Sequence, residues 1–300
     1  MPLHWFVTGS RGQLGRALTE QLRAAGAGVT TASHDELDIA DAAAVKARLA
    51  ELPRPIVCVN AAGFTHVDRC EREPEAAEHG NARGPASLAE ACVEHDAGLV
   101  HVSTDYVFAG DAQTPYPEDA PTAPRSVYGR TKLAGEQAVL AASPRFLVVR
   151  TSWVFGAGRN FLVAILNQAA LRRRGEASGP LRVVADQSGR PTYATDLAAA
   201  IVQLVEADAT GLFHFANAGV ATWWDLARFV LDEAGFGELQ VDRITTGEIA
   251  ADAPRPAWSV LGTERAEGLG VTPRPWQEAV RAYLASPDAP KLELEPTRAS

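Results

Sequence analysis

The chain has 300 residues, of which 46% are hydrophobic and 22% charged, so it is not a disordered chain and can form one large or two closely associated domains. Its formal net charge of −9 argues against a partner such as duplex nucleic acid, which needs a basic face. Three cysteines without ligand spacing favour the reducing cytoplasm, and neither a signal-peptide pattern nor a membrane-spanning apolar segment is expected.

The first half of the chain predicts strands that alternate with helices. Strands are expected where short apolar segments occur, at residues 3–9, 28–33, 55–62, 98–108 and 145–155. Helices are expected between them, at residues 14–26, 41–52, 73–96 and 127–142, the third with a bend at Gly84–Pro85. This alternation predicts βαβ units and therefore a parallel sheet covered on both faces.

The second half has a looser pattern. Helices are expected at residues 160–175, 194–207, 222–235 and 276–286, with Thr222 as an N-cap, and a further sheet strand at 211–219. We therefore predict an α/β fold, a Rossmann-type doubly wound parallel sheet with a smaller C-terminal substrate domain. The first domain would comprise residues 1–155 and about 181–217, the second about 156–180 and 218–285, and residues 286–300 would form a mobile tail.

The stretch TGSRGQLG, residues 8–15, follows the first predicted strand and opens the first predicted helix. In that setting Gly9 allows a tight turn, Gly12 lets backbone approach a pyrophosphate, and Gly15 lets the helix pack on the sheet. The helix N-terminus adds free N–H groups and a positive dipole end. The spacing alone also occurs in ordinary glycine-rich loops, but its setting predicts a dinucleotide site.

Two further segments are expected at the same edge of the sheet. The small residues of NAAG, residues 60–63, end the third strand and let a cofactor lie across the sheet edge. Asp38 follows the second strand, where a polar side chain can meet an adenine or a ribose.

Tyr128 and Lys132 are four residues apart on a predicted helix and therefore share one face. A lysine ammonium near a phenol stabilises the phenolate and lowers the tyrosine pKa, which predicts a general acid. The fourth strand ends in VSTDY, where Thr104 is placed to donate a hydrogen bond to a substrate carbonyl. Each of these side chains could instead have a purely structural role.

The motifs TGSRGQLG, NAAG, STDYVF and YGRTK, in this order, resemble the extended short-chain dehydrogenase/reductase family. The longer segments STDYVFAG, VYGRTKLAGE, RTSWVFG, DQSGRPTY and RPAWSVL resemble, within it, the dTDP-4-dehydrorhamnose reductases. The resemblance covers about residues 3–285.

This resemblance implies an NAD(P)H-dependent oxidoreductase that reduces the C4 ketone of dTDP-4-dehydrorhamnose to dTDP-L-rhamnose. Tyr128 would deliver the proton, Lys132 would hold the nicotinamide ribose, and Thr104 would polarise the carbonyl. Expected cofactor-binding residues are Gly9, Ser10, Arg11, Gly12, Gln13, Leu14, Asp38, Ile39, Ala61, Ala62, Gly63, Phe64, Ser103, Tyr128 and Lys132. Expected substrate-binding residues are Thr104, Asp105, Tyr106, Trp153, Arg190 and Arg255, the two arginines because their fork geometry suits the substrate's pyrophosphate. Asn81 matches a polar helix position that supports the site.

The expected cofactor is NADPH, with NADH as the alternative. Arg11 lies inside the glycine loop with His34 nearby, and a cation there accepts a 2′-phosphate, whereas Asp35 stands late for the acidic residue that is typical of NAD enzymes.

The chain also departs from the family pattern. Several such reductases are metal-bridged dimers held by carboxylates, but Ala17 and Thr195 stand where two carboxylates are expected. We therefore predict no required metal, and a monomer or a weak homodimer. Trp258 stands where an asparagine is common in this family, so the sequence does not define which residues form the pocket for the substrate's base.

Three alternatives remain. The first is a 4-ketoreductase for another dTDP-deoxysugar of antibiotic biosynthesis, of the dihydrostreptose type, to be decided by loops near residues 64–72, 153–160 and 253–258. The second is a sugar 4-epimerase, which would consume no NAD. The third is a non-enzymatic regulatory relative, against which the intact Thr104, Tyr128 and Lys132 argue.

Overall fold

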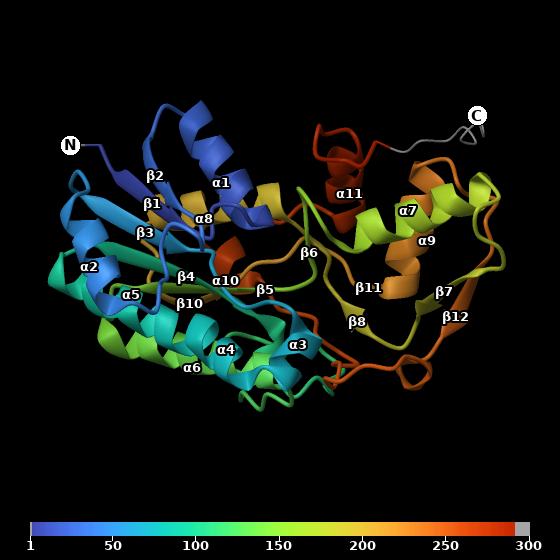
Figure 1. Ribbon diagram of the computed structural model, residues 1–300, viewed down its shortest axis with the longest axis horizontal. Helices are drawn as coiled ribbons and strands as arrows, with labels where there is room; N and C mark the ends of the chain where they lie inside the picture. Colours follow the sequence, from blue (N-terminus) through green and yellow to red (C-terminus); the bar gives the residue numbers. More distant parts are fainter. Residues whose placement is uncertain (1, 292–300) are drawn as a thin grey trace.

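The computed structural model describes residues 2–291, and its centre is a six-stranded sheet in the order β2-β1-β3-β4-β5-β10 (Figure 1). Its strands are β1 (His4–Thr8), β2 (Gly28–Ala32), β3 (Ile56–Asn60), β4 (Gly98–Thr104), β5 (Leu147–Thr151) and β10 (Gly211–His214). All neighbouring strands in it run parallel. The order reverses between β1 and β3, and ligands bind at the carboxyl ends of strands at such a switch point. The predicted fold class is confirmed.

Helices cover both faces of this sheet, as Figure 1 shows. Helices α1 (Gln13–Ala24) and α8 (Ala194–Glu206) bury apolar side chains against one face, and α2 (Ala42–Ala50), α5 (Gly84–Glu94) and α6 (Val127–Ala142) against the other. The strands serve both cores by alternation: Trp5 and Val7 lie in the first core and Phe6 in the second. Cys58 and Cys92 are free thiols buried in the second core.

The segment expected as one bent helix at residues 73–96 is three successive helices. They are α4 (Pro74–Glu78), a π-helix (His79–Arg83) and α5. The change to α5 occurs at Gly84–Pro85, because Pro85 lacks an N–H group and fits only the first turn of a helix. Glycine at position 84 leaves room for Ile39, since a Cβ there would lie 2.6 Å from Cδ1 of Ile39 and the Ile39 side chain would have to move.

A second hydrophobic core lies beyond the carboxyl edge of the sheet, on the right in Figure 1. Its helices are α7 (Phe161–Arg173), α9 (Trp223–Glu233) and α11 (Trp276–Leu284). Thr222 caps α9 as predicted: its Oγ1 accepts the Asp225 N–H at 3.1 Å, and the Asp225 carboxylate accepts the Thr222 N–H at 2.9 Å. We propose that this core belongs to the predicted substrate domain.

Short elements connect and border the two cores. They are α3 (Val67–Arg72), α10 (Glu264–Glu267), two 3-10 helices (Asp105–Val107 and Thr246–Glu248) and the paired strands β6 (Val154–Phe155) with β9 (Thr192–Tyr193), β8 (Ser188–Gly189) with β11 (Ala221–Thr222), and β7 (Leu181–Val184) with β12 (Val241–Ile244).

The first residue of the predicted tail, Ser286, is hydrogen-bonded to the last turn of α11. Ser286 Oγ donates a hydrogen bond to the Tyr283 carbonyl at 2.7 Å. The rest of the predicted mobile tail, residues 292–300, lies outside the described residues. Within residues 2–291, no helix is both long enough and apolar enough to span a bilayer.

Candidate functional site

The glycine loop turns sharply between β1 and α1. Gly9 has a φ of 67°, and a Cβ on it would lie 2.6 Å from the Ala61 carbonyl carbon, so the turn and the packing on the 60–63 segment both require glycine. Gly15 differs from the prediction. A Cβ on Gly15 would lie 2.3 Å from the Gly9 oxygen, so this glycine lets α1 approach the loop rather than the sheet.

The N-terminus of α1 opens at this loop. Gly12 is the N-cap and, having no side chain, leaves the first helical N–H groups, at Gln13 and Leu14, available to a ligand. The Gln13 Oε1 and Ser103 Oγ atoms are buried and have no hydrogen-bond partner within the described residues. Unpaired buried polar atoms are costly. These residues therefore fit a bound pyrophosphate-containing cofactor that supplies the missing partners.

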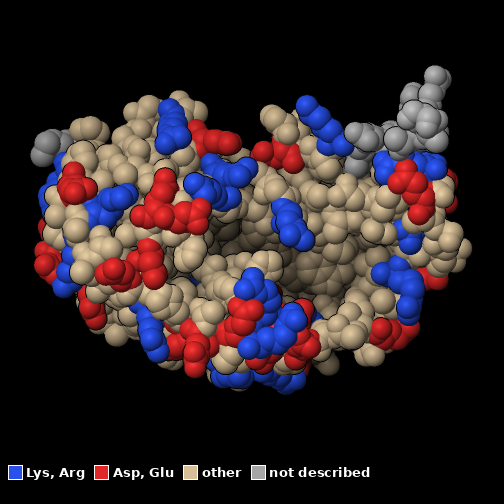
Figure 2. All heavy atoms as spheres, in the orientation of Figure 1, with Lys and Arg blue, Asp and Glu red and all other residues tan. Residues whose placement is uncertain are grey.

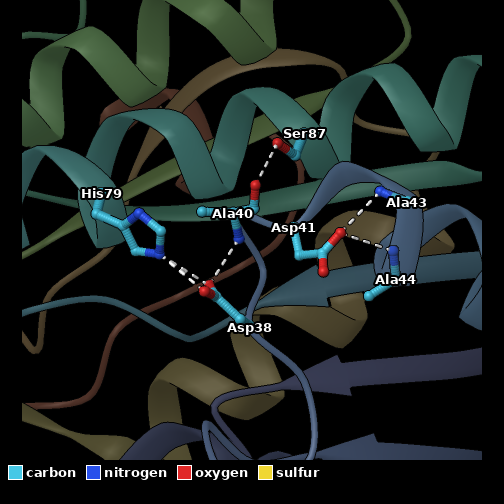
Figure 3. Close-up of polar contacts among 7 residues, drawn as sticks. All are labelled: Asp38, Ala40, Asp41, Ala43, Ala44, His79 and Ser87. Atoms are coloured by element: carbon cyan, nitrogen blue, oxygen red, sulfur yellow. Dashed lines mark hydrogen bonds and ion pairs between the residues drawn. The ribbon is translucent and has the colours of Figure 1, made fainter.

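Asp38 is held beside the π-helix, as Figure 3 shows. Its carboxylate accepts the Ala40 N–H at 3.0 Å and lies 2.8 Å from Nε2 of His79. Partial burial opposes ionisation, but these two hydrogen bonds and the nearby His79 and His34 together outweigh it and lower the pKa of Asp38. The carboxylate therefore stays charged where an adenine or ribose is expected. The Ile39 side chain is buried in the core, which leaves its backbone for the predicted cofactor contact.

The segment after β3 is fixed by two buried amides. Asn60 Oδ1 accepts the Ala62 N–H at 3.1 Å. Asn81 Oδ1 accepts the Phe64 N–H at 2.8 Å, and its Nδ2 donates to the Phe64 carbonyl at 3.0 Å. These bonds hold the backbone of residues 61–64 against the glycine loop, as the predicted cofactor site requires, and give Asn81 the supporting position expected for it.

Arg11 and Asp35 form an exposed ion pair at the edge of this region, with 2.5 Å between Nη1 and Oδ2. Both side chains project into solvent beyond the carboxyl end of β2. Arg11, the side chain predicted to bind a 2′-phosphate, is therefore already paired with the carboxylate of Asp35.

Tyr128 is brought to the end of β4 by a close approach of α6. A Cβ on Gly129 would lie 2.2 Å from the backbone carbonyl oxygen of Tyr106, so only glycine lets the helix come this near. The Tyr128 ring contacts Tyr106 edge-on, with 5.4 Å between centroids, and packs in a cluster with Cys70. The structure therefore brings Tyr128, Tyr106 and Thr104 together.

Burial raises the pKa of Tyr128 well above its usual value, although a hydrogen bond with Thr104 opposes this rise. The expected lowering by Lys132 is therefore wrong for this structure. Although Lys132 lies on the same helix face, its Nζ donates to the Val102 carbonyl at 2.6 Å. Tyr128 thus keeps its proton near neutral pH, as a proton donor must.

Lys132 is buried at the heart of the site. Burial lowers its pKa to about 8, against the opposing effect of Glu136 one turn further along α6. A Cβ on Gly63 would lie 4.0 Å from its Nζ, so the ammonium faces the segment predicted to line the cofactor.

Thr104 and Asp105 follow directly after β4. Thr104 Oγ1 donates to Asp105 Oδ1 at 2.9 Å and accepts the Tyr106 N–H at 3.2 Å. The hydroxyl proton expected to polarise a substrate carbonyl is therefore given to Asp105 here. The other carboxylate oxygen, Oδ2, is buried and unpartnered within residues 2–291.

We predict that Asp105→Asn stabilises the protein above pH 6. Burial raises the pKa of Asp105 to about 6 from an ordinary 3.8, so the folded state binds this proton more tightly than the unfolded state. The contribution of Asp105 to stability is therefore highest below pH 4 and falls as pH rises through 6, by up to about 3 kcal/mol. Denaturant unfolding at pH 4 and at pH 7.5 checks this: the variant should gain only at the higher pH, and an equal gain at both would contradict the assignment.

Trp153 stands after β5 with a φ of 48°, uncommon for a bulky residue. Its indole stacks on Trp223, with 3.7 Å between ring centroids, and any side chain at Gly189 would collide with it. One face of the Trp153 indole is thus covered by protein. That the uncovered part of the indole stacks on a sugar ring stays a prediction.

The two arginines predicted to bind phosphate are differently placed. Arg190 donates from Nε to the Asn217 carbonyl at 3.0 Å and from Nη1 to the Leu261 carbonyl at 2.6 Å, so most of its fork already binds protein. Arg255 donates to Asp68 Oδ2 at 2.6 Å. Its guanidinium also interacts with the Tyr106 hydroxyl, and its buried Nη1 has no other partner among the residues the structure describes.

The sequence predictions missed several buried polar residues, and three of them form a line toward Lys132: Thr8, the side chain of Asn60, and His101. Each is at most 1% exposed. A polar side chain inside an otherwise apolar strand was the available signal, notably His101 in GLVHVST.

The molecule is hollowed between the sheet and the second core, and Figure 2 shows this hollow with lysine or arginine side chains at its rim. Among the described residues, no group of three or more His, Cys, Asp or Glu side chains is arranged to hold a metal ion.

Comparison with known proteins places the chain in a known family. The family described as "RmlD substrate binding domain" matches residues 4–288. A probable dTDP-4,6-dihydroxy-2-methyloxan-3-one 4-ketoreductase of Streptomyces antibioticus is 47% identical over 99% of both chains. A dTDP-4-dehydrorhamnose reductase of Mycolicibacterium smegmatis is 44% identical over 93% of this chain and 84% of its own.

A solved structure supports the same placement. The dTDP-4-dehydrorhamnose reductase of Bacillus anthracis, in complex with NADP, is 33% identical and superposes with a TM-score of 0.87 over 95% of this chain and 99% of its own. The resemblance seen in the motifs is thus confirmed over nearly the whole chain, which belongs to the dTDP-4-dehydrorhamnose reductase family.

Proposed function

We propose that this protein reduces the C4 ketone of dTDP-4-dehydrorhamnose to dTDP-L-rhamnose, using NADPH. When bound, NADPH supplies the hydride. Tyr128 delivers a proton to the sugar oxygen, Thr104 orients the carbonyl, and the buried surroundings exclude water from both. Binding of the nucleotide part would position the ketone. For the pyrophosphate of that nucleotide part, Arg255 offers the donor Nη1.

The observation that carries this proposal is the position of Tyr128. A buried phenol that keeps its proton lies beside Thr104 at the carboxyl end of β4, on the same helix face as Lys132. The glycine loop meets the 60–63 segment at the β1/β3 switch point of the same sheet. The site therefore offers a proton donor and a cofactor cradle along one edge.

NADPH oxidation by the purified protein tests the proposal. The substrate is enzymatically prepared dTDP-4-dehydrorhamnose, and the product is identified by NMR. Formation of dTDP-L-rhamnose with one NADPH consumed per sugar is expected. Absence of turnover in a protein that still binds NADPH would exclude this substrate.

A second candidate is reduction of a different dTDP-4-keto sugar. It is favoured by the 47% identity to the Streptomyces antibioticus ketoreductase over nearly the full length of both chains. Since both reactions use the same donors, a competition assay with equal concentrations of the two ketones distinguishes them: the true substrate has the larger kcat/KM.

We predict that the Arg11–Asp35 pair sets cofactor preference. Arg11→Ala should lower kcat/KM for NADPH about tenfold and leave that for NADH nearly unchanged, because a guanidinium fork binds phosphate. Asp35→Asn should have the opposite effect, since it frees Arg11 from its carboxylate partner. Steady-state kinetics with both cofactors measure this, and an equal loss with both would show that Arg11 does not meet the 2′-phosphate.

We further propose a cytoplasmic enzyme that needs no metal and is a monomer or a weak homodimer. The methyl group of Ala17 and the hydroxyl of Thr195 cannot replace carboxylate ligands. Light scattering before and after addition of a chelator measures this, and loss of a stable dimer on chelation would contradict it.

A further inference from the structure

A line of buried polar side chains crosses three neighbouring strands toward Lys132. Thr8 of β1 is in register with Asn60 of β3, and Asn60 with His101 of β4. Register partners in a sheet point to the same face, here the face that α6 covers. Thr8 Oγ1 donates to Asn60 Oδ1 at 2.7 Å, and Asn60 Nδ2 lies 3.0 Å from His101 Nδ1. The line ends with His101 Nε2, 3.4 Å from Lys132 Nζ.

These contacts determine which ring nitrogen of His101 carries the proton. The backbone N–H of Ala62 can only donate, and it donates to Asn60 Oδ1, so the amide nitrogen of Asn60 must face His101. That nitrogen is also only a donor. Nδ1 of His101 must therefore accept, and the single proton of the neutral ring lies on Nε2. The ring is neutral because burial, and then the charge of Lys132, lower its pKa well below the usual value.

His101 consequently presents an N–H group, rather than a lone pair, to Lys132. An ammonium group has three donors and no acceptor, so it cannot form a hydrogen bond with this N–H, whereas a neutral amine can accept one. The Nε2–Nζ distance of 3.4 Å is longer than the range of about 2.7–3.2 Å usual for N–H···O hydrogen bonds, which agrees with two facing donors.

We propose that His101 is a positioning residue which, through the tautomer imposed by Asn60, makes the Lys132 ammonium a stronger acid. Other titratable groups beside Lys132 act differently. Glu136 supports the ammonium but is itself bound to Arg150, and Tyr128 keeps its proton. Burial of Lys132 acts in the same direction as His101, and the experiment separates the two.

The consequence for catalysis rests on the proposed reduction, whereas the tautomer and the acidity do not. Each turnover leaves Tyr128 as a phenolate, which must regain one proton. A more acidic ammonium one helical turn away gives up a proton more readily, becomes an amine, and recovers its proton from water.

The test is NMR titration of protein labelled at the lysine ε-carbons. The chain has only three lysines, Lys46, Lys132 and Lys291, so Lys46→Arg and Lys291→Arg assign the signals. His101→Gln, whose amide oxygen can accept from the ammonium, should raise the pKa of Lys132 by about one unit or more. His101→Phe removes the facing N–H without adding an acceptor or polarity, and should raise it less.

The phenylalanine variant separates the proposal from burial alone, which predicts an unchanged or lower pKa for Lys132. An unchanged or lower value in both variants would overturn the proposal. If neither variant folds, nitrogen-15 NMR of the wild-type histidines decides: an Nε2–H tautomer for His101 supports the proposal and an Nδ1–H tautomer overturns it. In the working enzyme, kcat is expected to decrease at alkaline pH, and in His101→Gln this decrease should shift to higher pH together with the Lys132 pKa.

Discussion

Tyr128→Phe is expected to lower kcat by a factor of about 10²–10⁴ and to weaken NADPH binding far less, because the hydroxyl it removes is the proton donor and only one of many groups expected to contact the cofactor. The phenol is 9% exposed and packs against Cys70 and Tyr106, so the phenylalanine ring can occupy the same space. Single-turnover reduction of dTDP-4-dehydrorhamnose measures the chemical step directly.

Tyr193→Phe is a matched control. Tyr193 is 5% exposed, and its ring stacks on Phe155 in the second core, with 5.5 Å between centroids. Its loss of a hydroxyl should leave kcat within about twofold of wild type, as for a change that removes no transition-state interaction. Equal losses in the two variants would mean that the Tyr128 hydroxyl acts through structure rather than by proton transfer.

Glu136→Gln is expected to destabilise the protein by about 3–5 kcal/mol, because it leaves a buried guanidinium without its counter-charge. Arg150 donates to both carboxylate oxygens of Glu136, at 2.9 and 2.7 Å, and the two side chains are 4% and 2% exposed. Arg150 also lies over the Phe108 ring, 4.9 Å from its centroid, so the pair joins α6 and β5 to the segment that follows Tyr106. Denaturant unfolding measures the loss.

The double variant Glu136→Gln/Arg150→Met should recover most of this stability, since an apolar side chain needs no counter-charge. A loss of less than about 1 kcal/mol in the single variant would place the pair in the range of exposed ion pairs and contradict its burial. Because Glu136 supports the Lys132 ammonium, the single variant should also lower the pKa of Lys132.

Much of the fold follows from local sequence. The alternation of apolar strands with amphipathic helices predicted the parallel sheet, because each strand needs apolar cover on both faces. Likewise, Thr222 predicted the start of α9, since an N-cap depends only on residues close to it in the chain. The site residues carried by one motif, such as Tyr128 with Lys132, were identifiable for the same reason.

Contacts between distant segments were decided by the tertiary structure alone. Gly15 faces the loop because α1 packs on Gly9, and Ile39 enters the core because Gly84 leaves room for it. Tyr128 keeps its proton because burial outweighs its local partners, which no spacing shows.

The sequence by itself therefore determined the fold class, the family and the residue types at the site. The register of β1, β3 and β4 decided which neighbours Lys132 has, since Thr8, Asn60 and His101 are separated by 52 and 41 residues along the chain. Protonation in a buried site depends on those neighbours and on exclusion of water, and both exist only once the chain has folded.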